Sequence, residues 1–173
     1  MMNENTLRPF DLRTDAGAPA HAVMTVIAVA GALTIGAYAR LPLPFTPVPL
    51  SLQTFAILAA PFLVGRSYAA MGAGLYLALG LAGAPIFAMA FGPTFGYILG
   101  FVAAPFAVMA FRNPLAGIVA GTAVIWALGA SWLAIWTGGN LPAAIMLGVA
   151  PFIPGDILKA AAAYAVAKRA AHQ

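Results

Sequence analysis

Long apolar runs alternate along this chain with short stretches that are rich in proline, glycine or basic residues. These stretches divide the chain into six apolar segments. A helix that crosses a hydrocarbon core of about 30 Å needs about 20 apolar residues, so the pattern predicts an all-α, polytopic membrane protein with six transmembrane helices. The segments cover residues 21–38, 51–64, 68–81, 94–111, 115–136 and 141–167, and the last is interrupted by the sequence PFIPGD.

The basic residues indicate how these helices are oriented. With six spans and a cytoplasmic N-terminus, six basic residues lie on the inner side of the membrane and only Arg40 lies on the outer side. Such an excess of lysine and arginine is typical of short cytoplasmic loops. We therefore expect cytoplasmic N- and C-termini in a multi-pass protein of the plasma (inner) membrane, with residues 1–19 as a polar cytoplasmic tail and residues 20–173 as a single six-helix substrate-binding domain. The six inner residues are Arg8, Arg13, Arg66, Arg112, Lys168 and Arg169.

The composition excludes several classes of protein. Hydrophobic residues make up 63% and charged residues 7% of the chain, and the mean hydropathy is +0.96, whereas a water-soluble domain carries about 25% charged residues. Without cysteine the chain forms no disulfide or thiolate metal site. It also has no glycine-rich phosphate-binding loop, so ATP-driven work belongs to a partner. The chain has a net charge of +4, but its basic residues form no cluster. They lie singly or in pairs, mostly beside the predicted spans, which indicates signals for membrane topology rather than binding to nucleic acid.

The three outer connections between segments differ from the inner ones. They hold nine of the fourteen prolines, and proline fixes the backbone and supplies no N–H group. Stiff apolar loops on one face are either ordinary linkers between spans or the walls and lid of a pocket. The second and third segments are short for complete spans, so we expect them to be tilted, packed centrally, or continued by ordered loops that line a cavity.

One carboxylate and one ammonium group lie close together in the last segment. No acidic residue occurs between Ala16 and Gly155, and Asp156 is then followed three positions later by Lys159. We expect Asp156 at the N-cap of a helix and Lys159 in its first turn, in the outer part of the bilayer. The pair is either a cap with a lysine that extends to the interface, or a site for a ligand with an N–H-bearing head and an anionic tail.

Further candidates for ligand contacts lie beside the outer loops. Gln53 begins an apolar helix and offers two donors and one acceptor without a charge, either to a ligand or to the backbone of a neighbouring helix. Thr94, Tyr97 and Asn140 are weaker polar candidates. The phenylalanines of the outer loops together suit an apolar ring system, and each alone is also typical of a membrane interface. They are Phe45, Phe87, Phe91, Phe95 and Phe152.

On the first predicted helix, Ala28, Ala32 and Gly36 form a ridge of small residues at intervals of four. Such a ridge allows two helices to approach closely, so it serves either packing inside the protein or docking of a partner subunit.

The sequence does not indicate an enzyme. His21 and His172 are the only histidines, both near the ends of predicted spans, and neither paired carboxylates nor metal-ligand spacing occurs. We therefore expect no catalytic residue, no metal and no cofactor.

Four motifs of the chain resemble those of a known family. PVPLSLQTF, GAPIFA, GPTFGYILGF and above all PFIPGDILKA occur in this order and are similar to motifs of the BioY family, the biotin-binding S component of energy-coupling factor (ECF) vitamin transporters. The resemblance implies six helices in the lipid bilayer, with biotin held on the outer side by Asp156 and Lys159. It also implies two kinds of partner: a transmembrane coupling subunit that docks on small residues of the first helix, and two ABC-type ATPases.

The third outer loop departs from the pattern of the family. It is shorter, has Phe95 where the family often has glycine, and carries no charged residue. We therefore expect the biotin carboxylate to meet Lys159, backbone amides or Arg40. The sequence predicts a membrane subunit that captures biotin from the outer side and delivers it inward with coupling and ATPase partners. The alternatives are an S component for another vitamin, such as thiamine or riboflavin, and a structural or assembly membrane protein without a ligand.

Overall fold

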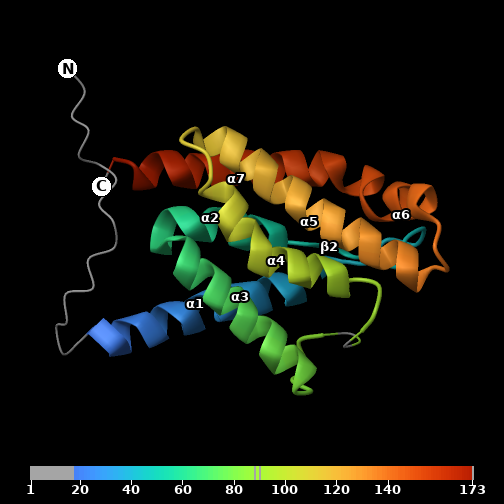
Figure 1. Ribbon diagram of the computed structural model, residues 1–173, viewed down its shortest axis with the longest axis horizontal. Helices are drawn as coiled ribbons and strands as arrows, with labels where there is room; N and C mark the ends of the chain where they lie inside the picture. The colour runs from blue at the N-terminus through green and yellow to red at the C-terminus, as the bar shows by residue number, and fades with distance from the viewer. Residues whose placement is uncertain (1–17, 88, 90, 173) are drawn as a thin grey trace.

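The computed structural model describes residues 18–87, 89 and 91–172, and it is an elongated bundle of helices (Figure 1). The expected cytoplasmic tail, residues 1–19, lies almost entirely outside the described residues. Two short strands, β1 (Arg40–Leu41) and β2 (Leu50–Ser51), pair antiparallel. The helices are α1 (Ala18–Tyr38), α2 (Gln53–Val64), α3 (Arg66–Leu81), α4 (Phe95–Val108), α5 (Pro114–Trp136), α6 (Leu141–Gly148), the 3-10 turn η1 (Ala150–Phe152) and α7 (Ile153–Ala170).

The helices follow the predicted apolar segments closely, because their ends carry local stop and start signals. Asn113 caps α5, since its Oδ1 accepts a hydrogen bond of 2.9 Å from the Leu115 N–H. Asn140 caps α6 in the same way, with 3.0 Å from the Ala143 N–H to its Oδ1. The Oδ1 of Asn140, a weaker candidate for a ligand contact, is therefore used by the helix end. The last segment is divided into α6, η1 and α7, as its interrupting prolines predict.

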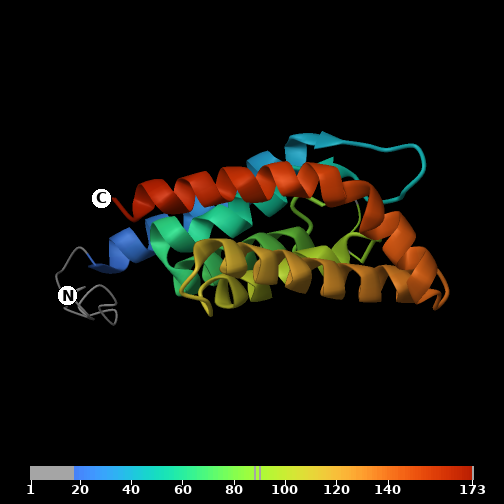
Figure 2. The same cartoon turned by 90° about the horizontal axis from the view of Figure 1, so that it is seen from above.

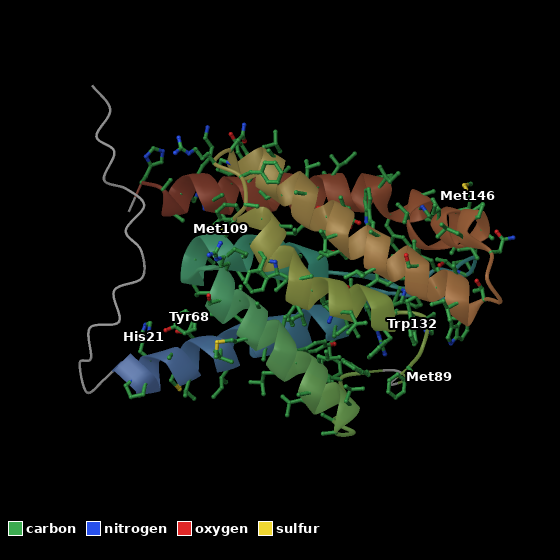
Figure 3. All side chains as sticks on the ribbon, viewed as in Figure 1. His21, Tyr68, Met89, Met109, Trp132 and Met146 are labelled. Atoms are coloured by element: carbon green, nitrogen blue, oxygen red, sulfur yellow. The ribbon has the colours of Figure 1, made fainter. Side chains whose placement is uncertain are left out.

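The two ends of the bundle differ in chemistry. The start of α1 and the end of α7 lie at one end, and the long connections and α6 lie at the opposite end (Figures 1 and 2). Figure 3 shows His21, Tyr68 and Met109 near the first end and Met89, Trp132 and Met146 near the second. We call the first the basic end, for Arg66, Arg112, Lys168 and Arg169, and the second the loop end, for residues 39–52, 82–94 and 137–152.

Three helical stretches are long and apolar enough to cross a membrane. They are Pro19–Tyr38, Pro114–Trp136 and Leu141–Ala170, the last of which joins α6, η1 and α7. The apolar helices α2 and α4 are shorter. With 12 residues, α2 is about 18 Å long at about 1.5 Å per residue. The chain is therefore a mostly helical protein with three candidate membrane spans among the described residues.

Glycines bring α4 and α5 into close contact. A Cβ atom at Gly96 would collide with the Leu128 carbonyl oxygen and with the Trp132 side chain, and one at Gly100 would lie 2.8 Å from the Ile125 Cα. On the other helix, a Cβ atom at Gly117 would collide with a backbone carbonyl of α4. Small residues on both helices thus let the two backbones approach, as is common for helices in membranes.

The ridge predicted on α1 is divided between two environments. Gly36 is buried against the start of α2, where a Cβ atom would lie 2.9 Å from the Gln53 nitrogen. The Leu52 N–H also donates to the Gly36 carbonyl at 3.3 Å. Of the two roles that the sequence allows for the ridge, Gly36 therefore serves packing inside the protein and is not available for partner docking, because the chain after β2 folds back onto it. Ala28 and Ala32 are exposed, and their role in docking stays a prediction.

Candidate ligand-binding site

A cavity lies in the half of the bundle that faces the loop end. Its volume, including the open mouth, is about 930 Å³. All six residues that the sequence proposes for ligand binding line this cavity, although they come from three helices and one loop: Gln53, Phe87, Thr94, Tyr97, Asp156 and Lys159. Tertiary structure thus brings together residues that are up to about a hundred positions apart in the sequence. Whether they bind a ligand stays a prediction.

The ion pair of α7 forms the centre of the polar wall. The Lys159 Nζ lies 2.9 Å from the Asp156 Oδ1 and donates to the Thr54 Oγ1 at 3.1 Å. The second carboxylate oxygen, Oδ2, accepts a hydrogen bond of 2.9 Å from the Trp126 indole N–H. Asp156 and Lys159 are only 7% and 9% exposed. Each charge is therefore held by side chains of other helices as well as by its neighbour, which a buried charge requires.

This geometry decides between the two interpretations of the pair. Asp156 is not the N-cap of α7, because the helix already begins at Ile153 and Asp156 lies within its first turn. Its carboxylate bonds to Trp126 and Lys159 rather than to the helix end. Lys159 does not extend to the interface, because its ammonium group is bonded inside the bundle. The cap with an extended lysine is therefore wrong, and the pair lies in the wall of an enclosed space.

Gln53 stands beside this pair at the first position of α2. Its Oε1 accepts a hydrogen bond of 3.4 Å from the Ser51 hydroxyl. Its Nε2 is buried and has no hydrogen-bond partner among the described residues. The side chain therefore does not serve a neighbouring helix backbone, which was one of the two roles that the sequence allows.

Aromatic side chains complete the lining of the cavity. Phe87 packs on Tyr76 with ring centroids 5.3 Å apart, and the Tyr97 hydroxyl donates to the Gly148 carbonyl at 2.7 Å. The proton of this hydroxyl is thus already used, and a contact of Tyr97 with a ligand stays a prediction. Thr94 lines the cavity, and its side chain makes no capping hydrogen bond to α4. A few polar groups among aromatic rings are typical of a small-molecule site.

Of the five phenylalanines that the sequence proposes, the cavity is lined by Phe87 and Phe152. Phe45 and Phe91 are each 60% exposed. Phe95 is buried between Phe91 and the Trp132 ring, with centroid distances of 5.0 Å to each. These three phenylalanines do not line the cavity, because Phe45 and Phe91 are exposed and Phe95 packs at the start of α4.

The loops at the cavity mouth are fixed by side-chain hydrogen bonds to their carbonyl groups. The Tyr38 hydroxyl donates to the Pro85 carbonyl at 2.9 Å, and the Trp132 indole donates to the Gly92 carbonyl at 2.9 Å. The first loop is joined to α6 by the Thr46 hydroxyl, which donates to the Leu147 carbonyl at 2.7 Å. The proline-rich connections are thus walls of the cavity rather than free linkers.

Sequence reasoning missed two residues of the polar wall, Trp126 and Thr54. Trp126 carries the indole N–H in the middle of a 23-residue apolar helix, and Thr54 directly follows Gln53. They could have been found from the rule that a buried carboxylate and a buried ammonium group each need further hydrogen-bond partners. Among the described residues, no group of three or more His, Asp or Glu side chains is placed to hold a metal ion.

Comparison with known proteins places this architecture in a family. The model of the BioY family matches residues 5–173. A curated protein of Thermotoga maritima named "Biotin transporter BioY" is 32% identical over 151 residues, which are 79% of this chain and 88% of that protein. The "Probable biotin transporter BioY" of Pyrococcus horikoshii is 36% identical over 156 residues, which are 84% of this chain and 94% of that protein.

A solved structure shares the fold. It is a crystal structure at 2.1 Å described as the S-component for biotin from an ECF-type ABC transporter. It superposes with a TM-score of 0.78 over 92% of this chain and 95% of that chain, at 24% sequence identity. At 24% identity, this similarity shows that the two proteins share the arrangement of their helices.

Proposed function

The chain belongs to the BioY family, and from this membership we propose that it is a biotin-binding membrane subunit for biotin uptake. It captures biotin from the outer side and delivers it inward without chemical change, so it is a transport protein and not an enzyme. Relatives named biotin transporters, which match most of this chain, support this proposal. ATP-driven work requires partners, because this chain has no phosphate-binding loop.

The observation that carries the proposal is a cavity whose lining combines the buried Asp156–Lys159 pair with aromatic side chains. Biotin has a cyclic urea with N–H donors and a carbonyl acceptor, an apolar thioether ring and chain, and a carboxylate. Asp156 can accept a urea N–H, and Lys159 can donate to a ligand oxygen. The aromatic wall of Tyr76, Phe87 and Tyr97 suits the apolar part.

The membrane arrangement is part of the same proposal. The joined stretch of α6, η1 and α7 gives a sixth crossing after α1 to α5, with both termini on the cytoplasmic side of the plasma (inner) membrane. The position of the basic residues at one end supports this orientation. The cavity then lies in the outer half and opens to the outside, where the vitamin is captured.

Partner subunits complete the proposal. The coupling transmembrane subunit docks on α1, where Ala28 and Ala32 form an exposed strip of small side chains. Two ABC-type ATPases would supply the energy for release of biotin to the inside. No cofactor or metal is required, because the ligand leaves unchanged.

Titration of the detergent-purified protein with biotin tests the function directly. We expect saturable binding with one site by isothermal titration calorimetry, and a higher melting temperature with biotin than without it. Thiamine and riboflavin at the same concentrations serve as controls and should leave the melting temperature unchanged. Stabilisation by one of these vitamins instead of biotin would favour an S component of other specificity. The absence of any ligand effect would favour a structural membrane protein.

The charge of the cavity predicts where the biotin carboxylate lies. Among the described residues, its charged lining consists of Arg40, Asp156 and Lys159, which leaves one net positive charge. Since Asp156 already pairs with Lys159, Arg40 at the mouth is the cation that is left for an anionic ligand. We expect Arg40→Gln to weaken the binding of biotin about fivefold, because exposed ion pairs contribute up to about 1 kcal/mol. The binding of biotinol, the uncharged alcohol, should not change. Calorimetry with both ligands measures this, with Arg66→Gln at the basic end as the control.

A further inference from the structure

One aromatic ring of the cavity lining packs on a glycine of α3. The Phe87 side chain lines the cavity, whereas Gly80 is buried and does not line it. A Cβ atom at Gly80 would collide with three atoms of the Phe87 ring, Cε1, Cε2 and Cζ. The ring therefore occupies the space that any side chain at position 80 would need.

The preceding turn of α3 holds the same part of the chain. Tyr76 lies four residues before Gly80, so the two share one face of the helix. The Tyr76 ring is buried and packs on the Phe87 ring with centroids 5.3 Å apart, and its hydroxyl donates to the carbonyl of Ile86, the residue before Phe87, at 3.3 Å. Ring and backbone are thus both bound to α3, which restricts where the ring can go if it is displaced.

A glycine in the interior of a helix needs a reason, because it is less favourable there than alanine. Gly74, in the same helix, has no such reason in the packing, since a Cβ atom there would meet no atom within 4 Å. At Gly80 the reason is the Phe87 ring. The two glycines of α3 therefore differ in what a methyl group would do at each of them.

We propose that Gly80 determines the size of the cavity, because it lets the Phe87 ring lie directly against α3. A methyl group at position 80 would push the ring away from the helix and into the space that it lines. This inference rests on the proposed function. It makes Gly80 a positioning residue, which contributes to the choice of ligand by size although it does not line the cavity.

A double-mutant cycle with biotin tests whether Gly80 acts through Phe87. We expect Gly80→Ala to weaken the binding of biotin roughly tenfold or more, as overpacking does. In the background of Phe87→Leu, the same change should weaken it less than about threefold, because the smaller side chain leaves room for the methyl group. Isothermal titration calorimetry of the wild type, both single variants and the double variant measures this.

A smaller ligand separates an effect on cavity size from general damage to the site. Desthiobiotin lacks the sulfur atom of biotin and therefore has one ring instead of two. If Gly80→Ala narrows the cavity, it should weaken the binding of desthiobiotin less than that of biotin, so that the ratio of the two dissociation constants shifts toward the smaller ligand. A merely structural glycine would weaken both by the same factor and leave this ratio unchanged.

Thermal melting without ligand follows the same contact. We expect Gly80→Ala to lower the melting temperature by about 2–10 °C, and the double variant with Phe87→Leu to recover most of this loss. Gly74→Ala is the matched control and should melt at or above the wild-type temperature with unchanged affinity for biotin. If Gly80→Ala does not fold, the double variant should still fold and bind biotin.

An equal effect of Gly80→Ala in both backgrounds would overturn the inference, as would an unchanged ratio of biotin to desthiobiotin or a double variant that does not fold. A wild type that does not bind biotin is a different result, because it contradicts the proposed function itself.

Discussion

Replacement of Asp156 by asparagine is expected to lower the free energy of unfolding by about 3–5 kcal/mol, because it leaves a buried ammonium group without its counter-ion. Lys159 is 9% exposed, and its only other partner among the described residues is the Thr54 hydroxyl. The same change should weaken biotin binding roughly tenfold to a hundredfold, since a hydrogen bond to a charged acceptor is lost. Thermal melting in detergent and calorimetry measure the two effects.

A neutral variant separates the contribution of the pair to stability from its contribution to binding. It combines Asp156→Leu, Lys159→Met and Trp126→Phe, so that neither a buried charge nor the indole N–H remains without a partner. Apolar replacement of a whole buried ion pair is often neutral or stabilising. We expect the neutral variant to regain most of the stability that Asp156→Asn loses, and to bind no biotin.

The comparison of these two variants can contradict the proposed site. If the neutral variant binds biotin with the wild-type affinity, the ligand does not use the pair. If Asp156→Asn melts like the wild type, the pair is not desolvated in the way that the structure shows. Arg66→Gln at the basic end is a suitable control for the removal of a charge far from the cavity.

Introduction of a leucine at Gly96 is expected to disrupt the packing of α4 against α5 strongly. The first added carbon would already collide with the Leu128 carbonyl oxygen and with the Trp132 side chain, so α4 must move away from α5. Overpacking of this kind costs typically about 1–3 kcal/mol and occasionally more, and we expect Gly96→Leu at or above the upper value. Biotin binding should also weaken, because the adjacent Tyr97 lines the cavity and would move with α4.

Gly74 of α3 offers the matched control for this prediction. A Cβ atom at Gly74 would meet no atom within 4 Å, so Gly74→Leu should change neither the melting temperature nor the biotin affinity by much. Equal behaviour of Gly96→Leu and Gly74→Leu would show that α4 and α5 do not depend on the close approach.

Local chemistry predicts the helices of this protein well. Proline and glycine act on the residues beside them, so the interruption of the last segment at PFIPGD appears as η1 between α6 and α7. The exact start of α7 was harder to predict. Asp156 has the preferred composition of an N-cap, but η1 runs directly into the helix and moves its start to Ile153.

The small residues also show the difference between what the sequence predicts and what the packing decides. The ridge on α1 is visible in the sequence, and the glycines of α4 and α5 are equally visible. The sequence does not say which of them face a neighbour, because a glycine looks the same at every position. Gly36 of the ridge is buried inside the protein, whereas Ala28 and Ala32 are exposed. Close contact between α4 and α5 occurs at Gly96, Gly100 and Gly117.

The sequence by itself determined the membrane class, the approximate limits of the helices and the Asp156–Lys159 pair, because hydropathy, helix signals and a spacing of three residues are all local properties. Only the tertiary structure decided what completes the pair. Trp126 and Thr54 are 30 and 105 positions away from the groups that they bond. It also decided which phenylalanines line the cavity. Such facts depend on which faces of distant helices meet, and packing sets this only when the whole chain is folded.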